Sequence, residues 1–314
     1  MEELLKHGYS KRSTGTELVF KIIDDLRNAF EQGGSNLFFR KYKEYVEYLK
    51  INRPASVGSW NILRFIGKHI VDNGFDDLLE YLDKLKKDVD NACWEASKVA
   101  SNRVVDGDVI MTISNSLCVR RMFKILVDEG IYFKVFVLES RPGMEGLELA
   151  SYLNDLGVET YLVVDSAGRF FMKEVDKVFV GAEAIAVNGA VVGKVGTSLL
   201  SLVANEARVR VFVIAPLYKF SFETIHGELV KLPEGGWRLL MSEDVRKRLP
   251  ENYVARAPLY EVTPPYLIDG IATEYGLFAP QAVPVILRQV YNSFPPNVPS
   301  IDEITRLLEG IVKG

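Results

Sequence analysis

The fold is decided by residues 106–220, which begin DGDVIMTISNS (106–116), pass through VFVLESRPGMEG (135–146) and end in VRVFVIAPLYKF (209–220). Short runs rich in β-branched residues alternate there with stretches at helical spacing; the runs are 109–113, 135–138, 160–164, 177–180 and 209–215. Runs that are apolar on both faces, joined by helical crossovers, are typical of a parallel sheet buried on both sides. The sequence therefore predicts an α/β fold, with a Rossmann-like parallel-sheet domain over residues 103–314.

Polar residues follow each of these runs at the point where the run stops. They are Ser114-Asn115-Ser116, Glu139-Ser140-Arg141, Asp165-Ser166, Glu183 and Lys219. The carboxyl ends of the strands in an open α/β sheet line one crevice, and ligands bind there. We therefore expect these side chains to converge on one pocket.

Residues 1–102 carry helical spacing and no strand pattern. Apolar residues recur on one helix face from Gly15 onward, and Gly33-Gly34 is expected to stop that helix. Further helices are predicted near 38–48, 57–71 and 75–99. This pattern indicates an N-terminal helical domain ahead of the sheet domain.

Residues 221–259 lack periodicity and are mostly polar, which predicts a long surface insertion. Insertions of this length are usually functional. Four apolar residues inside it need cover from a partner or from their own domain: Trp237, Leu239, Leu240 and Met241.

Composition excludes several classes of protein. The chain has 314 residues and a net charge of −4, so nothing indicates a basic nucleic-acid-binding domain. Cys93 and Cys118 are too few for a disulfide framework or a zinc site, and Cys118 is expected to be buried packing. No apolar run reaches 18 residues and the N-terminus has no signal-peptide pattern, so we expect a cytoplasmic protein without membrane contact. Few Gln and Cys beside many Lys, Glu and Arg hint at a thermophile.

Three long segments carry a resemblance to a known family: ESRPGMEG (139–146), VGAEAIAVNGAVVGKVGT (180–197) and EVTPPYLIDGIATEYG (261–276). They resemble the superfamily of the α, β and δ regulatory subunits of translation initiation factor 2B and their archaeal relatives. This superfamily also contains the isomerases of methylthioribose 1-phosphate and ribose 1,5-bisphosphate. The resemblance runs from about residue 11 to about residue 280.

The resemblance implies two catalytic positions, and this chain differs at both. Ser114 stands where the isomerases have a catalytic cysteine, and Glu183 stands where they have an acid–base aspartate. A thiol is tuned into the working pH range more easily than a hydroxyl, and no histidine lies beside Ser114 in the sequence to activate it. Glutamate is one methylene longer than aspartate, which displaces its carboxylate.

The resemblance also implies cations that bind phosphate. Arg53 and Lys219 match phosphate-binding residues of the isomerases, and Lys194 is kept where the family has Asn-Lys, although Gly193 replaces the asparagine. Gly15 lies at a helix start, which suits a phosphate, but the segment 13–15 keeps the family's Arg-Gly-Ala triplet only loosely. The alternatives are an ordinary helix cap at 13–15 and a surface arginine at Arg53.

Other candidate ligand contacts belong to the same segments. Arg141 is suited to clamp an anion, or else pairs with Glu139 or Glu145. Ser116 is expected to cap the helix that follows it. Asn188 with Gly189 predicts a hairpin with a type I′ turn. We place Ser116, Arg141, Glu145 and Asn188 in the predicted ligand-binding set, and predict neither a metal nor a cofactor.

Together these features predict a pocket that holds a phosphorylated small molecule, either a sugar phosphate or a nucleotide. Because both catalytic positions differ, the sequence favours a protein like the 2B regulatory subunits, in a homodimer or higher oligomer, with translation initiation factor 2 as a candidate partner. The alternative is a sugar-phosphate aldose–ketose isomerase. A third hypothesis gives the protein a vestigial pocket and a role in assembly alone.

Overall fold

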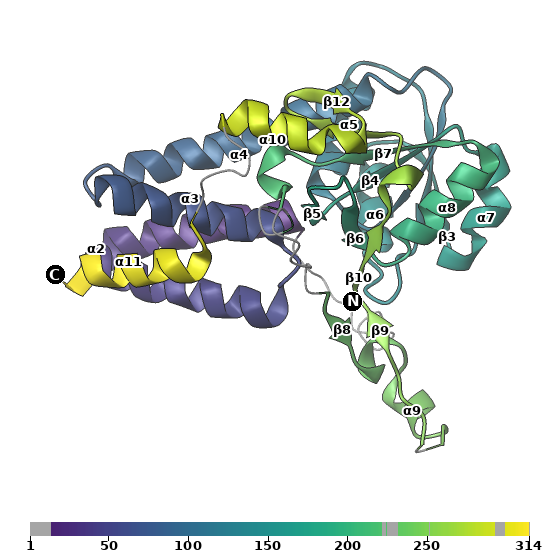
Figure 1. Cartoon of the computed structure of the whole chain (residues 1–314). Helices are drawn as coiled ribbons and strands as arrows, with labels where there is room; N and C mark the ends of the chain where they lie inside the picture. The colour runs from purple at the N-terminus through teal and green to yellow at the C-terminus, as the bar shows by residue number, and fades with distance from the viewer. Residues whose placement is uncertain (1–13, 222–223, 225–231, 251, 293–298, 314) are drawn as a thin grey trace.

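The computed structural model describes residues 14–221, 224, 232–250, 252–292 and 299–313. Helices of the N-terminal region lie beside a mostly parallel sheet with its own helices, which confirms the predicted α/β fold (Figure 1). The helices are α2 (Gly15–Asn52), α3 (Val57–Asn73), α4 (Leu78–Ser101), α5 (Leu117–Asp128), α6 (Gly146–Asp155), α7 (Gly168–Phe171), α8 (Thr197–Ala207), α9 (Glu243–Arg246), α10 (Val283–Tyr291) and α11 (Ile301–Lys313).

The main sheet has the strand order β12-β11-β7-β4-β1-β2-β3. All pairs are parallel except β11 with β12. The five predicted strands are found within two residues of their expected ends: β1 (Val109–Ile113), β2 (Lys134–Leu138), β3 (Glu159–Val163), β4 (Lys177–Gly181) and β7 (Arg210–Ile214). The third hallmark segment adds β11 (Gly270–Thr273) and β12 (Gly276–Phe278) at one edge.

Both faces of the strands β1, β2, β4 and β7 are buried, as their apolar runs require. The edge strand β3 has no buried residue, contrary to the prediction for the run 160–164, because only β2 covers one of its two edges and few helices reach it. Ile110 of β1 packs in a cluster with α4, α5 and α6, whereas Met111 and Ile113 pack on the opposite face with α7, α8 and α10. Successive side chains of a strand point to opposite faces. The two clusters therefore follow from the same five-residue run.

A second, three-stranded sheet lies beside the main one. It has the order β10-β6-β5, from β5 (Ala184–Ile185), β6 (Val191–Lys194) and β10 (Tyr260–Thr263). The predicted hairpin between β5 and β6 is present, but only Gly189 of the turn pair has a positive φ, of 81°. A type I′ turn needs positive φ at both central residues, so that turn type was wrong. Instead, the N–H of Ala186 donates to the carbonyl of Ala190 at 2.9 Å and closes a loop of three residues.

The helical layer is built from α2, α3, part of α4 and the C-terminal α11. Gly33 and Gly34 have non-helical backbone angles inside α2, so the predicted break is present as a kink. Ile304 and Leu308 of α11 pack into the same core as α2 and α3. The domain boundary at residue 102 stays a prediction, and α11 adds residues from the far end of the chain to this layer.

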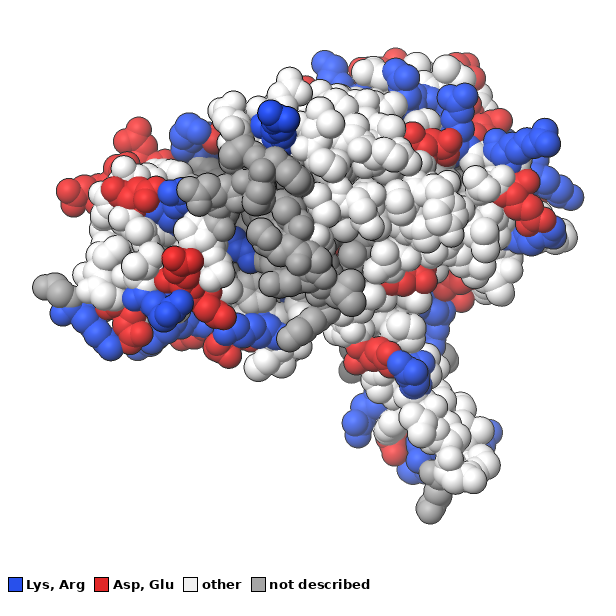
Figure 2. Space-filling view, viewed as in Figure 1, with Lys and Arg blue, Asp and Glu red and all other residues white. Residues whose placement is uncertain are grey.

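The predicted insertion forms an arm that projects from the body (Figure 1). Its described part contains α9 and the paired strands β8 (Glu234–Gly235) and β9 (Ala257–Pro258). Within residues 232–250 and 252–256 no side chain is buried. The four apolar residues that we expected to need cover are half-exposed in this structure: Trp237, Leu239, Leu240 and Met241. Figure 2 shows that much of the arm carries no charge.

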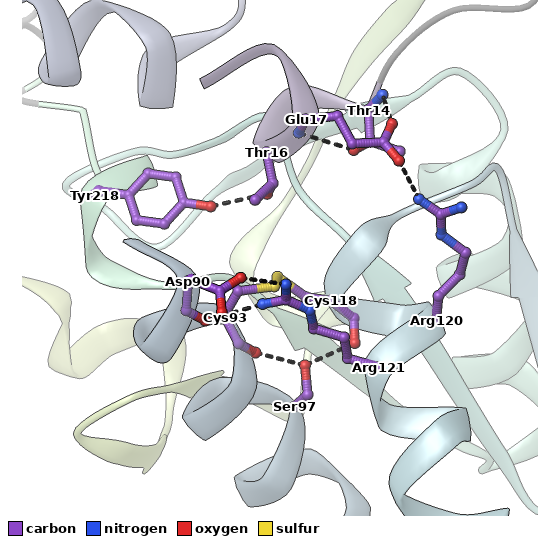
Figure 3. A network of polar contacts seen from close by, with 10 residues as sticks. All are labelled: Thr14, Thr16, Glu17, Asp90, Cys93, Ser97, Cys118, Arg120, Arg121 and Tyr218. Carbon is purple, nitrogen blue, oxygen red and sulfur yellow. Dashed lines mark hydrogen bonds and ion pairs between the residues drawn. A yellow bond between two sulfur atoms is a disulfide. The ribbon is translucent and has the colours of Figure 1, made fainter. Parts of the chain in front are cut away.

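The two cysteines form one disulfide, which the count of two cysteines had not led us to expect, and Cys118 is buried as predicted. Cys93 of α4 and Cys118 of α5 are fully buried, with 5.5 Å between their Cα atoms (Figure 3). The pairing arises because α4 lies directly along α5, a relationship that sequence spacing does not reveal. Among the described helices, none is long and apolar enough to cross a membrane.

Candidate functional site

A polar pocket lies where the strand ends of the sheet face the first turn of α2. Its walls come from α2, from the segments after β1 and β4, and from β6 and β10. The lining residues are Thr14, Gly15, Thr16, Arg53, Ile113, Ser114, Asn115, Ser116, Leu117, Glu145, Val180, Gly181, Ala182, Glu183, Gly193, Lys194, Thr197, Lys219 and Tyr260.

The loops after β1, β2 and β3 are tied to one another by hydrogen bonds. Asp165 accepts from the backbone N–H groups of Ser140 and Arg141, at 2.8 and 2.6 Å. The Ser140 hydroxyl in turn accepts from the N–H of Ser114, at 2.6 Å. Ser114 has a φ of 70°, in the left-handed region that non-glycine residues rarely adopt. These bonds hold Ser114 at the pocket wall.

Glu183 faces the start of α2 and two cations. A Cβ added to Gly15 would lie 3.0 Å from Glu183 Oε2. Arg53 and Lys219 both interact electrostatically with this carboxylate. The pocket therefore sets the Glu183 carboxylate between the start of α2 and two cations.

Arg53 is buried rather than a surface arginine, with 7% of its area exposed. Its Nη1 donates to the Tyr260 hydroxyl at 3.3 Å. Burial opposes the charge of Arg53, but Tyr260 and Glu183 outweigh burial and raise its pKa. Arg53 therefore remains a cation at the pocket wall.

Lys219 lies beside the residues that follow β4. It is 4% exposed, and its Nζ donates to the carbonyl of Ala182 at 2.9 Å. Burial lowers the pKa of Lys219, and the Glu183 carboxylate opposes that effect only in part. Lys219 is thus a cation that loses its proton more easily than an exposed lysine.

Lys194 and Glu145 form a buried ion pair in the pocket, with 2.7 Å between Nζ and Oε1. The second oxygen of this carboxylate, Oε2, is buried and has no hydrogen-bond partner among the described residues. A buried acceptor without a donor is costly, so Glu145 Oε2 is a position for a ligand hydroxyl.

The start of α2 is a helix cap, which was one of the alternatives for residues 13–15. Thr14 and Glu17 form a capping box, and Arg120 of α5 pairs with Glu17 (Figure 3). The Thr16 hydroxyl forms a hydrogen bond with the buried Tyr218 hydroxyl at 2.8 Å. Tyr218 directly precedes Lys219 in the sequence. Gly15 still lines the pocket. Ser13 lies outside the described residues.

The pocket brings together most of the predicted site residues: Gly15, Arg53, Ser114, Ser116, Glu145, Glu183, Lys194 and Lys219. Ser116 occupies the N-cap of α5 but makes no capping hydrogen bond with its side chain.

Two predicted residues lie elsewhere. Arg141 donates to the carbonyls of Leu239 and Leu240 in the arm, at 3.2 and 2.8 Å. Asn188 is exposed, and its Oδ1 accepts from the N–H of Ala190 at 3.0 Å, inside its own turn. In this structure both side chains contact the chain itself, and their ligand contacts stay predictions.

Sequence analysis missed other pocket residues. Tyr260 reaches the pocket because β10 pairs antiparallel with β6, which sets Tyr260 opposite Lys194. Thr197 follows the Gly193-Lys194 segment and donates its hydroxyl to the Lys194 carbonyl at 2.6 Å. The only feature of the sequence that could have indicated a role for Tyr260 in the pocket was its position just before the third hallmark segment, residues 261–276. No metal-binding group of three or more His, Cys, Asp or Glu occurs among the residues that the structure describes.

The sequence pattern of the initiation factor 2 subunit family matches residues 12–280. The chain belongs to this family. One relative in it is the ribose 1,5-bisphosphate isomerase of Methanocaldococcus jannaschii, 37% identical over 256 residues, which cover 81% of this chain and 82% of that protein. Another is the delta subunit of translation initiation factor eIF2B from Schizosaccharomyces pombe, 31% identical over 90% of this chain and 66% of that protein.

A solved structure of the same family has a similar fold. The Pyrococcus horikoshii translation initiation factor eIF-2B superposes with a TM-score of 0.73 and 29% identity, covering 89% of this chain and 96% of that one. The family therefore holds proteins named as isomerases and proteins named as translation factors, as the sequence segments indicated.

Proposed function

We propose that this family member is a sugar-phosphate aldose–ketose isomerase acting on a ribose 1,5-bisphosphate-like substrate. The main support is its 37% identity, over 81% of the chain, to a relative named for that activity. The sequence alone favoured a regulatory protein, because both catalytic positions differ. The relatives support the alternative hypothesis better, and the pocket must therefore perform the chemistry with other groups.

Glu183 is the residue that supports an enzyme most strongly. Isomerisation moves a proton between adjacent carbons, which requires a base that is ionised at the working pH. Glu183 is a carboxylate of the pocket wall, and Arg53, Lys219 and the start of α2 lie around it. A glutamate carboxylate also serves as the general base of triosephosphate isomerase, another aldose–ketose isomerase.

The pocket also carries charges suited to a phosphorylated sugar. Arg53 and Lys194 are buried cations on different walls, one at the end of α2 and one at the end of β6. Two separated cations fit a substrate with a phosphate at each end. Glu145 Oε2, which lacks a donor among the described residues, fits a sugar hydroxyl between them.

A regulatory protein that binds the same ligand is the second candidate. Ser114 favours it, since a serine hydroxyl without a base gives too little anion to move protons. The relative from S. pombe, named as a translation factor subunit, agrees with this candidate. Either candidate places the protein in the cytoplasm, and the second includes translation initiation factor 2 as a partner.

Oligomerisation is part of both candidates. Exposed apolar side chains lie on neighbouring elements of the α/β layer, where Figure 2 shows a broad uncharged area: Leu199 and Leu202 on α8, Val262 on β10, Tyr266 on the following 3₁₀ helix and Val285 on α10. Such a face needs a partner. Sedimentation at micromolar concentration should give a dimer or a higher even-numbered oligomer, and a monomer would contradict this.

Calorimetry and substrate NMR together separate the two candidates. Both predict that ribose 1,5-bisphosphate binds, and only the isomerase converts it to the ketose. Binding without conversion favours the regulatory protein. If the ligand does not bind, both candidates are wrong.

A further inference from the structure

We infer that the Cys93–Cys118 disulfide is a redox-sensitive positioning device for the pocket, so that its reduction weakens ligand binding. The bond joins α4 to the first turn of α5, whose N-cap Ser116 lines the pocket. The inference rests on the proposed function in one respect, since it takes this pocket as the place where a phosphorylated ligand binds. It adds a link between that binding and the oxidation state of the chain.

The residues directly before Cys118 form one wall of the pocket. Residues 115–117 line it, and Cys118 follows them in the first turn of α5. The Ser116 side chain packs against the backbone at the end of β4, because a Cβ added to Gly181 would stand 2.6 Å from Ser116 Oγ. Close packing of this kind leaves the first turn of α5 little room to move without changing the pocket.

The same turn of α5 is tied to a second wall of the pocket. Arg120 pairs with Glu17, which forms the capping box with Thr14 at the start of α2 (Figure 3). Gly15, between the two capping residues, lines the pocket. Because Arg120 lies two residues after Cys118, a shift of this part of α5 acts on both walls.

Noncovalent contacts also hold α5 against α4 beside the disulfide. The Ser97 hydroxyl lies 2.6 Å from the Cys93 carbonyl oxygen and 2.8 Å from the Cys118 carbonyl oxygen. Arg121 pairs with the Asp90 carboxylate and donates to the Asp90 carbonyl at 2.9 Å. These contacts do not depend on the oxidation state of the cysteines. Reduction therefore loosens α5 from α4 without separating the two helices, and reoxidation restores the bond.

Reduction changes the packing of a site that is closed to solvent. A dithiol reductant supplies two electrons and two protons: the S–S bond breaks, each cysteine becomes a thiol, and the reductant becomes a disulfide. Cys93 and Cys118 are both fully buried, within one core cluster. Two thiol groups in place of one bond are accommodated by movement of the surrounding helices, since a close-packed interior takes up such a change only by shifting.

Ligand binding opposes this movement, which makes the link reciprocal. A ligand held between the two walls binds the oxidised arrangement more tightly than the loosened one. By thermodynamic linkage, the factor by which reduction weakens ligand binding equals the factor by which the ligand makes the disulfide harder to reduce. A disulfide that served global stability alone would shift unfolding and leave the affinity of the folded protein unchanged.

The test measures the dissociation constant of ribose 1,5-bisphosphate by calorimetry, for the oxidised and the reduced full-length protein. We expect reduction to raise this constant about tenfold, within the usual range of couplings between two sites. Redox titration with a dithiol should then give a midpoint potential about 30 mV more negative with saturating ligand than without it, because tenfold corresponds to about 30 mV for a two-electron couple.

Two variants separate positioning from stability. The Cys93→Ala, Cys118→Ala variant should bind the ligand as weakly as the reduced wild type and should not respond to the reductant. Leu287→Ala removes buried atoms of α10, on the other face of the sheet, and lowers stability by a comparable amount. Its affinity should equal that of the oxidised wild type. An equally weakened affinity in Leu287→Ala would assign the effect to stability and overturn the inference.

Hydrogen exchange tests the same inference without a ligand. On reduction, the amides of residues 17–21 in α2 and 120–124 in α5 should exchange faster, while those of β7 should not change. Unchanged exchange in both segments, unchanged affinity and potential, or unfolding of the protein on reduction would each overturn the inference. If ribose 1,5-bisphosphate does not bind the oxidised protein, the proposed function is wrong, and hydrogen exchange then decides whether the disulfide positions the pocket walls.

Discussion

The Glu183 carboxylate lies against Gly15, so close that a methyl group on Gly15 would stand 3.0 Å from Oε2 and 3.3 Å from Oε1. Gly15 opens the long helix of the helical layer, and Glu183 lies two residues after the end of β4. The candidate base is therefore positioned by the layer that contains no strand. Its carboxylate meets the positive end of α2, where the peptide dipoles favour a negative charge.

Gly15→Ala should reduce turnover without reducing stability. Alanine is the better helix former, but its methyl group forces the Glu183 carboxylate to move by tenths of an ångström. We expect kcat to fall about tenfold, since misplacement by about 1 Å costs about 100-fold. Gly310→Ala, where no atom lies within 4 Å, is the control. Equal kinetics of Gly15→Ala and wild type, measured with an unchanged melting temperature, would show that this contact does not position the base.

Lys194→Ala should weaken ligand binding roughly ten- to 150-fold, from the loss of one charge-assisted hydrogen bond. It should also destabilise the fold, because it leaves the Glu145 carboxylate buried without its cation. A Lys194→Met, Glu145→Gln double variant should recover stability but not affinity. Calorimetry and thermal unfolding measure the two effects separately. Wild-type affinity in Lys194→Ala would place the phosphate elsewhere.

Removal of the Cys93–Cys118 disulfide should lower the melting temperature. The bond closes a loop over a sequence separation of 25, which corresponds to roughly 3–4 kcal/mol of unfolding free energy in the chain-entropy estimate. Reductant should lower the melting temperature of the wild type and leave a Cys93→Ala, Cys118→Ala variant unchanged. A thiol titration of the unfolded wild type that finds two free thiols before reduction would contradict the pairing.

Stability should depend on Glu17 at acid pH. Burial would raise the pKa of Glu17, but hydrogen bonds from Thr14 and the charge of Arg120 outweigh burial and lower it below 4.5. A lowered carboxylate pKa contributes stability above the unfolded value, and the contribution is lost as pH falls through the folded value. The stability difference between wild type and Glu17→Gln should therefore be constant above about pH 5 and shrink below pH 4.5. The exposed control Glu80→Gln should change the unfolding free energy less than Glu17→Gln does. A stability difference between wild type and Glu17→Gln that does not change with pH would contradict the account.

Local patterns predicted the elements of this fold well. The five apolar runs became parallel strands because short, near-continuous runs of β-branched residues suit a sheet covered by helices, although the edge strand β3 is not buried. The break at Gly33-Gly34 was also predictable from local sequence, because it depends on the backbone freedom of those two glycines. The convergence of Ser114, Glu183 and Lys219 followed from parallel strands sharing one edge.

Contacts between distant segments were not predictable from local pattern. The approach of Gly15 to Glu183 and the Cys93–Cys118 pair depend on how the helical layer packs on the sheet. The contacts of Arg141 with the carbonyls of Leu239 and Leu240 in the arm were likewise not visible from its side-chain chemistry, which indicated only an anion or a neighbouring glutamate as partner. Tyr260 enters the pocket only through the register of β10 on β6. In each case the partner is set by three-dimensional packing rather than by neighbours in the sequence.

The most direct test of the account is NMR of ribose 1,5-bisphosphate incubated with the purified wild-type protein. The same measurement is made on Glu183→Gln and on a Ser114→Cys, Glu183→Asp double variant. The account predicts conversion to the ketose by the wild type at about 1 s⁻¹ or faster, within the usual enzyme range, and loss of conversion in Glu183→Gln. No conversion by the wild type, with conversion restored in the double variant, would contradict it and show a binding pocket that lacks the groups for chemistry.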